Sequence, residues 1–267
     1  MIGAALMLLA SQLGSAPTPP PPPVSAPIAA PLQFAPPIGQ PMTYRVTSRR
    51  LGRDGAMMNY TLVYALQWDR AGRGLQLAAT LRRIETDARP ELAQMLTGLL
   101  QPLIGEPMTY LVAPDGSSID LVDPEAQWQR VLGKVQDMAA KAAQGEARQM
   151  AGLLAAMTPV ERDRLASADV RALVAPANSS IPVSAKDGTD IAVDQDGNRR
   201  TVTEVERSEV KAGDAARSLK IATTWKIDTA TGLVLGERRE TWTGGADGGE
   251  PRLAEERIRE LAAGDPG

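Results

Sequence analysis

The fold is decided by residues 58–68, whose sequence is MNYTLVYALQW. Large apolar or aromatic side chains occupy every second position of this stretch, and Asn59, Thr61 and Gln67 lie between them. Strict period-two alternation over this length predicts a long β-strand with one buried face.

The same alternation continues on both sides of this strand. Residues 42–47 alternate before a turn at 52–55, and residues 75–81 alternate after a turn at 69–74. Three strands joined by short turns predict an antiparallel meander. Further strands are expected at residues 108–112, 119–122, 190–194, 199–210, 219–227 and 233–243. Residues 252–262 fit a helix by apolar spacing and a strand by their place after a hairpin-like loop, and we favour the strand.

Two helical insertions interrupt the strands. Residues 90–103 carry leucines at helical spacing, and residues 124–172 are rich in helix-forming side chains. Within the second insertion, Thr158 and Glu161 have the spacing of a capping box, which predicts a new helix start. The expected fold class is α+β, with a curved antiparallel sheet packed against several helices.

Two N-terminal segments are unsuited to a folded core. Residues 1–16 begin with the apolar run MIGAALMLLA, which resembles the centre of a secretory signal peptide, although no Lys or Arg precedes Arg45. Residues 17–41 hold eleven of the twenty-one prolines, which predicts a disordered, semi-rigid tether. We therefore expect a signal peptide, a tether, a single β-rich domain over residues 42–267, and export to the periplasm.

A short internal repeat links two of the expected strands. Residues 38–46 (IGQPMTYRV) and 104–112 (IGEPMTYLV) are identical at seven of nine positions, and the similarity extends no further on either side. We interpret the repeat as two strands entered through the same Gly-x-Pro turn, in preference to a functional duplication.

Composition excludes several function classes. The chain has no Cys and no His, which removes disulfides, thiol nucleophiles, soft-metal sites and the usual general base near neutral pH. A net charge of -3 argues against a nucleic-acid partner. No P-loop, dinucleotide fingerprint or nucleophile elbow is present. We expect no catalytic residue, no metal site and no cofactor, and the protein is not expected to be an enzyme.

Two groups of acidic residues have features of a functional site, one of a calcium loop and one of a catalytic carboxylate pair. Each is better explained as ordinary secondary structure. The stretch from Asp187 to Asn198 lacks two essential ligands of a calcium loop, so a hairpin turn is favoured. Glu204 and Glu206 fall on one face of a strand about 7 Å apart, a spacing suited to acid–base work on a glycoside. Because that strand is polar throughout, we interpret both as solvated carboxylates.

The remaining candidate site is the apolar face of the sheet. Either helices fill this face as a simple core, or sheet and helices enclose a cavity that takes an apolar ligand. The side chains expected to contact such a ligand are Tyr60, Leu62, Tyr64, Leu66, Trp68, Leu219, Ile221 and Trp225.

The order of elements, together with the turn at residues 228–233 (DTATGL), resembles exported β-rich proteins of Gram-negative bacteria. The layout is also similar to the half-barrel superfamily of periplasmic lipoprotein carriers, in which a curved sheet wraps over helices and holds acyl chains. The resemblance implies binding of a lipid or another apolar ligand, and it assigns no ligand residue.

Two functions are therefore expected. The first is a periplasmic or envelope binding or carrier protein with an apolar pocket between sheet and helices. The alternative is a non-enzymatic structural or interaction protein of the cell envelope, with a fully packed core and an envelope protein as its partner.

Overall fold

The computed structural model describes residues 32–52, 55–90, 93, 97, 100–141, 152, 155–182, 184–185, 188–212, 215–244 and 250–264. The expected signal peptide, most of the tether and half of the helix expected at 90–103 lie outside these residues. Residues from Leu32 onward form one compact unit, which begins ten residues before the domain start expected at residue 42.

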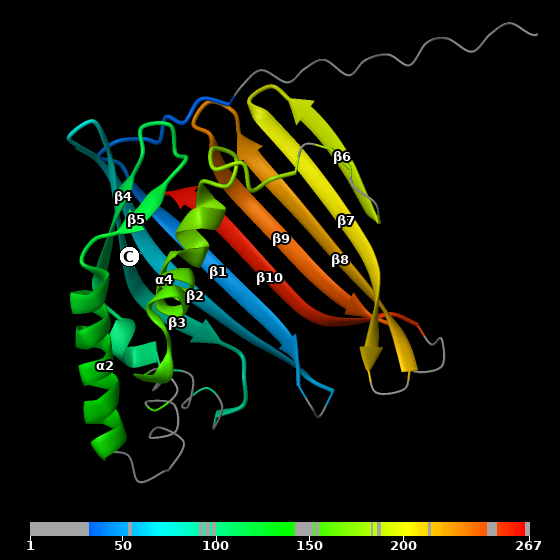
Figure 1. Ribbon diagram of the computed structural model, residues 1–267, viewed down its shortest axis with the longest axis horizontal. Coiled ribbons are helices and arrows are strands. Elements are labelled where there is room, and N and C mark those ends of the chain that lie inside the picture. Colours follow the sequence, from blue (N-terminus) through cyan, green and yellow to red (C-terminus); the bar gives the residue numbers. More distant parts are fainter. Residues whose placement is uncertain are drawn as a thin grey trace, which may run out of the picture. The chain divides into compact units, whose positions relative to one another are not determined.

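The described residues form an open antiparallel sheet of ten strands (Figure 1). The strands are β1 (Pro41–Leu51), β2 (Met57–Ala71), β3 (Gly74–Thr86), β4 (Pro107–Val112), β5 (Ile119–Leu121), β6 (Thr189–Asp196), β7 (Arg199–Ala212), β8 (Ala215–Asp228), β9 (Leu233–Thr243) and β10 (Arg252–Ala263). Their order across the sheet is β5-β4-β3-β2-β1-β10-β9-β8-β7-β6. The expected strands are confirmed, including the ambiguous segment at 252–262.

The order of strands in the sheet places the two ends of the domain side by side. Strand β10 pairs with β1 on one side and with β9 on the other, so it joins an N-terminal group of strands to a C-terminal group. The meander expected from the first three strands is confirmed, because β1, β2 and β3 are sequential neighbours.

In the described part of the chain, two helices and one short turn of 3-10 helix cover part of the sheet. They are η1 (Gln101–Leu103), α2 (Pro124–Lys141) and α4 (Pro159–Leu173). Figure 1 shows α2 and α4 on the side of β1 to β5, and no helix over β6 to β8 in the described part of the chain. We call the face of the sheet beneath α2 and α4 the helix-side face, and the opposite one the far face.

Helix α4 begins where the sequence predicts. The Thr158 hydroxyl accepts a hydrogen bond from the Glu161 backbone amide, and the Glu161 carboxylate accepts one from the Thr158 amide at 2.8 Å. This reciprocal pair is a capping box, and it satisfies two amides that the first turn of a helix leaves without partners.

The internal repeat corresponds to the same turn used twice. Gly39 and Gly105 both adopt positive φ, at 70° and 79°, which glycine tolerates without a steric penalty. The amide of Gly39 donates to the carbonyl of Trp68 at 2.7 Å, and the amide of Gly105 donates to that of Leu81 at 2.8 Å. Each glycine therefore anchors the start of a strand, β1 or β4, to the sheet.

Buried side chains gather in two clusters. The larger lies under α4 and across β1 to β5, and its centre includes Trp68, Leu77 and Tyr110. The smaller surrounds Trp225 and Ile227 of β8. The two are separate cores on one sheet.

The segment before β1 packs onto the ends of the strands. The Phe34 ring meets the Trp68 ring edge-on with centroids 5.6 Å apart, and the Ala35 amide donates to the Thr231 carbonyl. A Cβ on Gly232 would lie 2.5 Å from the carbonyl oxygen of Gln33, so this turn requires glycine. Part of the segment expected as tether is thus built into the fold.

No helix in the described ranges is both long enough and apolar enough to cross a membrane.

Candidate functional site: an apolar cavity between sheet and helices

A cavity of about 610 Å³ lies between the helix-side face and the helices. Its floor comes from β1 to β5 and β10, and its other walls come from η1, α2 and α4. The apolar wall includes Leu62 and Leu66 from the sheet, Val131 and Val135 from α2, and Leu165 from α4. Most of its surface is apolar, so it suits a hydrocarbon better than a polar solute.

The structure separates the predicted contact residues into two groups. Tyr60, Leu62, Tyr64 and Leu66 all line the cavity. The remaining four are not among the residues that line it: Trp68, Leu219, Ile221 and Trp225.

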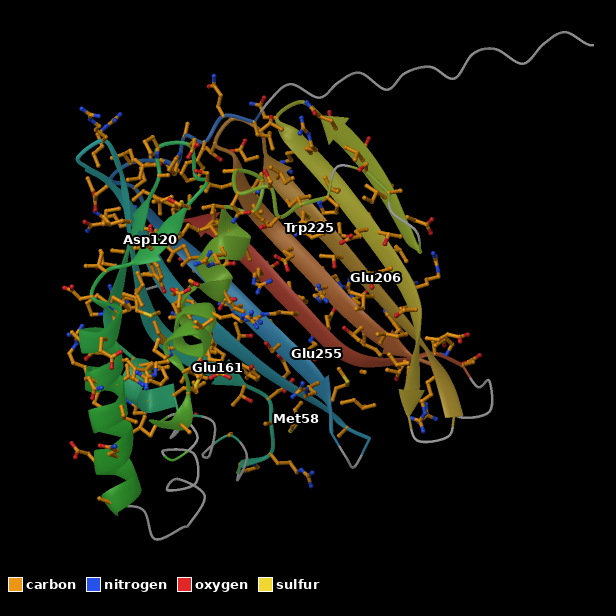
Figure 2. All side chains as sticks on the ribbon, viewed as in Figure 1. Met58, Asp120, Glu161, Glu206, Trp225 and Glu255 are labelled. Carbon is orange, nitrogen blue, oxygen red and sulfur yellow. The ribbon has the colours of Figure 1, made fainter. Side chains whose placement is uncertain are left out.

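Trp68 is fully buried in the larger core, and Trp225 belongs to the smaller one. Strand β8, which carries Leu219, Ile221 and Trp225, lies four strands from β2, or about 19 Å at ordinary strand spacing. In Figure 2, Trp225 lies over the C-terminal strands, apart from Glu161 at α4. The two apolar stretches share a face, but they do not line one cavity.

Two tyrosines connect the cavity floor to α4. The Tyr44 hydroxyl donates to the Asp169 carbonyl at 3.2 Å, and the Tyr110 hydroxyl donates to the Ala166 carbonyl at 2.7 Å. Burial, followed by the nearby Asp169 carboxylate, raises the pKa of Tyr44, and the same two causes raise the pKa of Tyr110 and of Tyr64. These hydroxyls therefore remain protonated donors across the physiological pH range.

The α2 end of the cavity holds an aromatic–guanidinium contact. The Arg162 guanidinium lies 5.0 Å from the centre of the Trp128 ring and donates to the Glu125 carboxylate at 3.1 Å. The Trp128 indole N–H is buried and has no hydrogen-bond partner in the part of the chain that the structure describes.

The β10 end of the cavity is charged. Asp169 of α4 accepts hydrogen bonds from Arg257 at 2.8 Å and from Arg259 at 3.0 and 3.1 Å, all at Oδ1. Arg259 also pairs with Glu237 of β9. Burial alone would lower the pKa of Arg259, but Glu237 and Asp169 outweigh it and raise that pKa. This charged group connects α4 to the middle of the sheet.

Sequence reasoning did not single out Tyr44, Tyr110 or Arg257. The first two occupy the same position of the internal repeat, so the repeat itself could have indicated them. Arg257 and Arg259 are two residues apart, and a strand assignment for 252–262 places them on one face. The sequence does not indicate the carboxylate to which both arginines donate, because Asp169 lies 88 residues from Arg257 in the chain.

The acidic groups weighed from the sequence do not converge on the cavity. Glu204 is half-buried and Glu206 is exposed on β7, and neither lines the cavity. Residues 189–196 form β6, which turns at 197–198 into β7, so the predicted hairpin is confirmed where the structure describes it. Among the described residues, no group of three or more acidic side chains could hold a metal ion.

Comparisons with known proteins return distant structural similarity. No family model matches the chain, and no curated protein matches it. A solved domain from Vibrio parahaemolyticus, assigned to the outer membrane lipoprotein-sorting proteins, is similar at 8% identity with a TM-score of 0.17, over 84% of this chain and 85% of that one. A LolA superfamily protein from Nitrosomonas europaea is similar at 7% identity with a TM-score of 0.18, over 84% of each chain. At these TM-scores neither similarity supports a conclusion about this chain.

Proposed function

We propose that this protein is an exported binding or carrier protein that holds an apolar ligand in the cavity between its sheet and its helices. The observation that carries the proposal is the cavity itself. Its volume of about 610 Å³ lies within the range of about 300–1,000 Å³ that small-molecule sites occupy.

Packing physics favours an occupied cavity. Protein interiors are close-packed, and voids larger than a water molecule are few in each domain. An apolar void of this size holds water poorly, because water needs several polar partners. Filling it with hydrocarbon removes apolar surface from water, which stabilises the complex by about 25 cal/mol per Å² buried.

The alternative, a structural protein with a fully packed core, lacks this support. The larger buried cluster lies under α4 and across β1 to β5, and the smaller one surrounds Trp225. Between α2, α4 and the sheet, open volume remains. We propose a role in binding and not in catalysis, and localisation to the periplasm on the basis of the apolar segment at residues 1–16.

Uptake of an uncharged fluorescent dye tests the proposal. The full chain should bind N-phenyl-1-naphthylamine saturably at one site, with enhanced fluorescence, and hexadecan-1-ol should displace it. Native mass spectrometry of protein purified from the cell envelope should show a co-purified apolar ligand. A folded chain that takes up no dye and carries no ligand would refute the carrier role.

A matched pair of substitutions on α4 locates the site. Ala168 is half-buried and lines the cavity, whereas Val160 is 71% exposed on the same helix. Ala168→Phe fills part of the cavity and should weaken dye binding at least tenfold, while Val160→Phe should leave it unchanged. Equal effects of the two would place the dye elsewhere.

A further inference from the structure

Three arginines gather where the cavity reaches β10. Arg257 lines the cavity, Arg259 lies two residues further along the same face, and Arg239 of β9 lies directly opposite Arg257 in the strand register. Two carboxylates, Asp169 and Glu237, accompany them. The five side chains together carry one surplus positive charge.

The hydrogen bonds within this group are unevenly distributed. Arg259 is 8% exposed and donates to both carboxylates. Arg257 donates to Asp169 through Nη2 alone, and its Nε–H is buried without a hydrogen-bond partner among the described residues. Arg239 is exposed, and it forms no ion pair within the described ranges.

This arrangement is unfavourable without a further anion. Like charges directly opposite each other on neighbouring strands destabilise a sheet. A buried donor that has lost its water and gained no acceptor is also costly, and such a group in a native protein needs an explanation. The repulsion acts between Arg239 and Arg257, and the buried donor without an acceptor belongs to Arg257.

The nearby carboxylates do not supply the missing acceptor. Asp169 already accepts three hydrogen bonds at one oxygen. Glu255 pairs with Arg50, and Glu237 pairs with Arg259. Glu204 lies beyond Thr223, two strand spacings or about 10 Å from Arg239.

We propose that Arg257 and Arg239 form the head-group site of the cavity, and that its ligand is a long-chain carboxylic acid. The carboxylate bridges the guanidinium groups of Arg257 and Arg239, and the hydrocarbon chain lies in the apolar cavity. This inference rests on the proposed carrier function, and it adds the chemical class of the ligand and its orientation.

The dimensions fit such a ligand. From β10 to β5 the cavity floor crosses five strand spacings, about 24 Å. One leaflet of a bilayer is about 15 Å of hydrocarbon, so an extended acyl chain fits within that span. The side chain of Arg257 is 36% exposed, so the head group lies at the solvent-facing end of the cavity.

Displacement of the dye by matched ligands tests the inference on the full chain. Hexadecanoic acid should compete at least tenfold more strongly than hexadecan-1-ol or methyl hexadecanoate, which share its chain but not its charge. Arg239→Gln should remove most of that preference by weakening the acid alone. Because Arg239 is exposed, this substitution leaves the fold intact.

Two further variants complete the design. Arg257→Gln should also remove the preference, and retained hexadecan-1-ol binding shows that the variant is folded. Arg207→Gln, an exposed arginine on the far face at β7, should change neither affinity.

The possible outcomes distinguish the two proposals. If acid and alcohol compete equally in the unsubstituted protein, or if Arg239→Gln leaves the preference intact, the head-group site is refuted while the carrier function stands. If no long-chain compound displaces the dye, and the dye itself fails to bind, the carrier function fails and the head-group site fails with it.

Discussion

At the scale of single residues, three of the four tyrosines are neutral phenols in an apolar wall. Tyr44 and Tyr110 are almost fully buried, and Tyr64 is half-buried. Burial is the largest cause of the raised pKa at each, because an ionised phenol loses its hydration there. Ionising any of them would place a negative charge in the cavity floor, near the Asp169 carboxylate.

Alkaline pH should therefore unfold the protein through these tyrosines. Below pH 10, the ordinary pKa of the phenol, they are protonated in both states and contribute no pH dependence. Above it the unfolded chain releases protons that the folded chain retains, so the free energy of unfolding falls by about 1.4 kcal/mol per pH unit for each tyrosine. Tyrosinate absorbance and circular dichroism should change together, and Tyr64→Phe should make the fall less steep by about a third. Full tyrosinate absorbance in a chain that keeps its native circular dichroism would contradict this.

At the scale of elements, the sheet is joined at its middle by one buried carboxylate. Glu256 of β10 lies on the far face and is 1% exposed. It accepts a hydrogen bond from Arg49 of β1 at 2.8 Å and another from Arg238 of β9 at 2.7 Å. A single side chain thus bonds to both neighbours of its strand, and it does so where the N-terminal and C-terminal strands meet.

Replacing Glu256 should cost more than replacing the residue beside it. Glu256→Gln removes the buried charge that both arginines share, and it should destabilise the protein by about 1–3 kcal/mol, less than for a fully buried pair because the arginines reach water. Glu255→Gln removes an exposed pair with Arg50 at 3.4 Å and should cost about 0.5 kcal/mol or less. Urea unfolding of both variants provides the measurement. Equal midpoints would show that the buried carboxylate has no special role in joining the strands.

The elements themselves could be predicted from the sequence wherever the signal is local. Alternation over residues 58–68 gave a strand, and the capping box at Thr158 gave the start of α4, because both patterns are contained within a few residues. The order of strands could not be predicted, because no local pattern records that β10 inserts between β1 and β9. For the same reason the sequence grouped Trp225 with Tyr64, which face the same way on strands that lie far apart.

At the scale of the whole molecule, covered and bare parts of one sheet should differ in local stability. Strands β1, β10 and β9 are paired on both sides, and β1 also lies under the helices. Strand β6 is an edge strand, and its residues are almost all exposed. Amides that exchange only by global unfolding belong to central strands, whereas edge amides exchange through local opening that costs much less.

Hydrogen exchange measured by mass spectrometry should show this difference in local stability between strands. It should also show which elements the ligand contacts. Peptides from β1 and β10 should exchange slowest, and peptides from β6 should exchange fastest among the strands. Saturating N-phenyl-1-naphthylamine should slow exchange in α2 and α4, because a ligand that binds only the folded state stabilises the elements that enclose it. It should leave β6 unchanged, because local opening of an edge strand that lies four positions from β10 does not open the cavity. Uniform slowing across all ten strands would indicate one cooperative unit, and slowing confined to β6 to β8 would place the ligand on the bare part of the sheet.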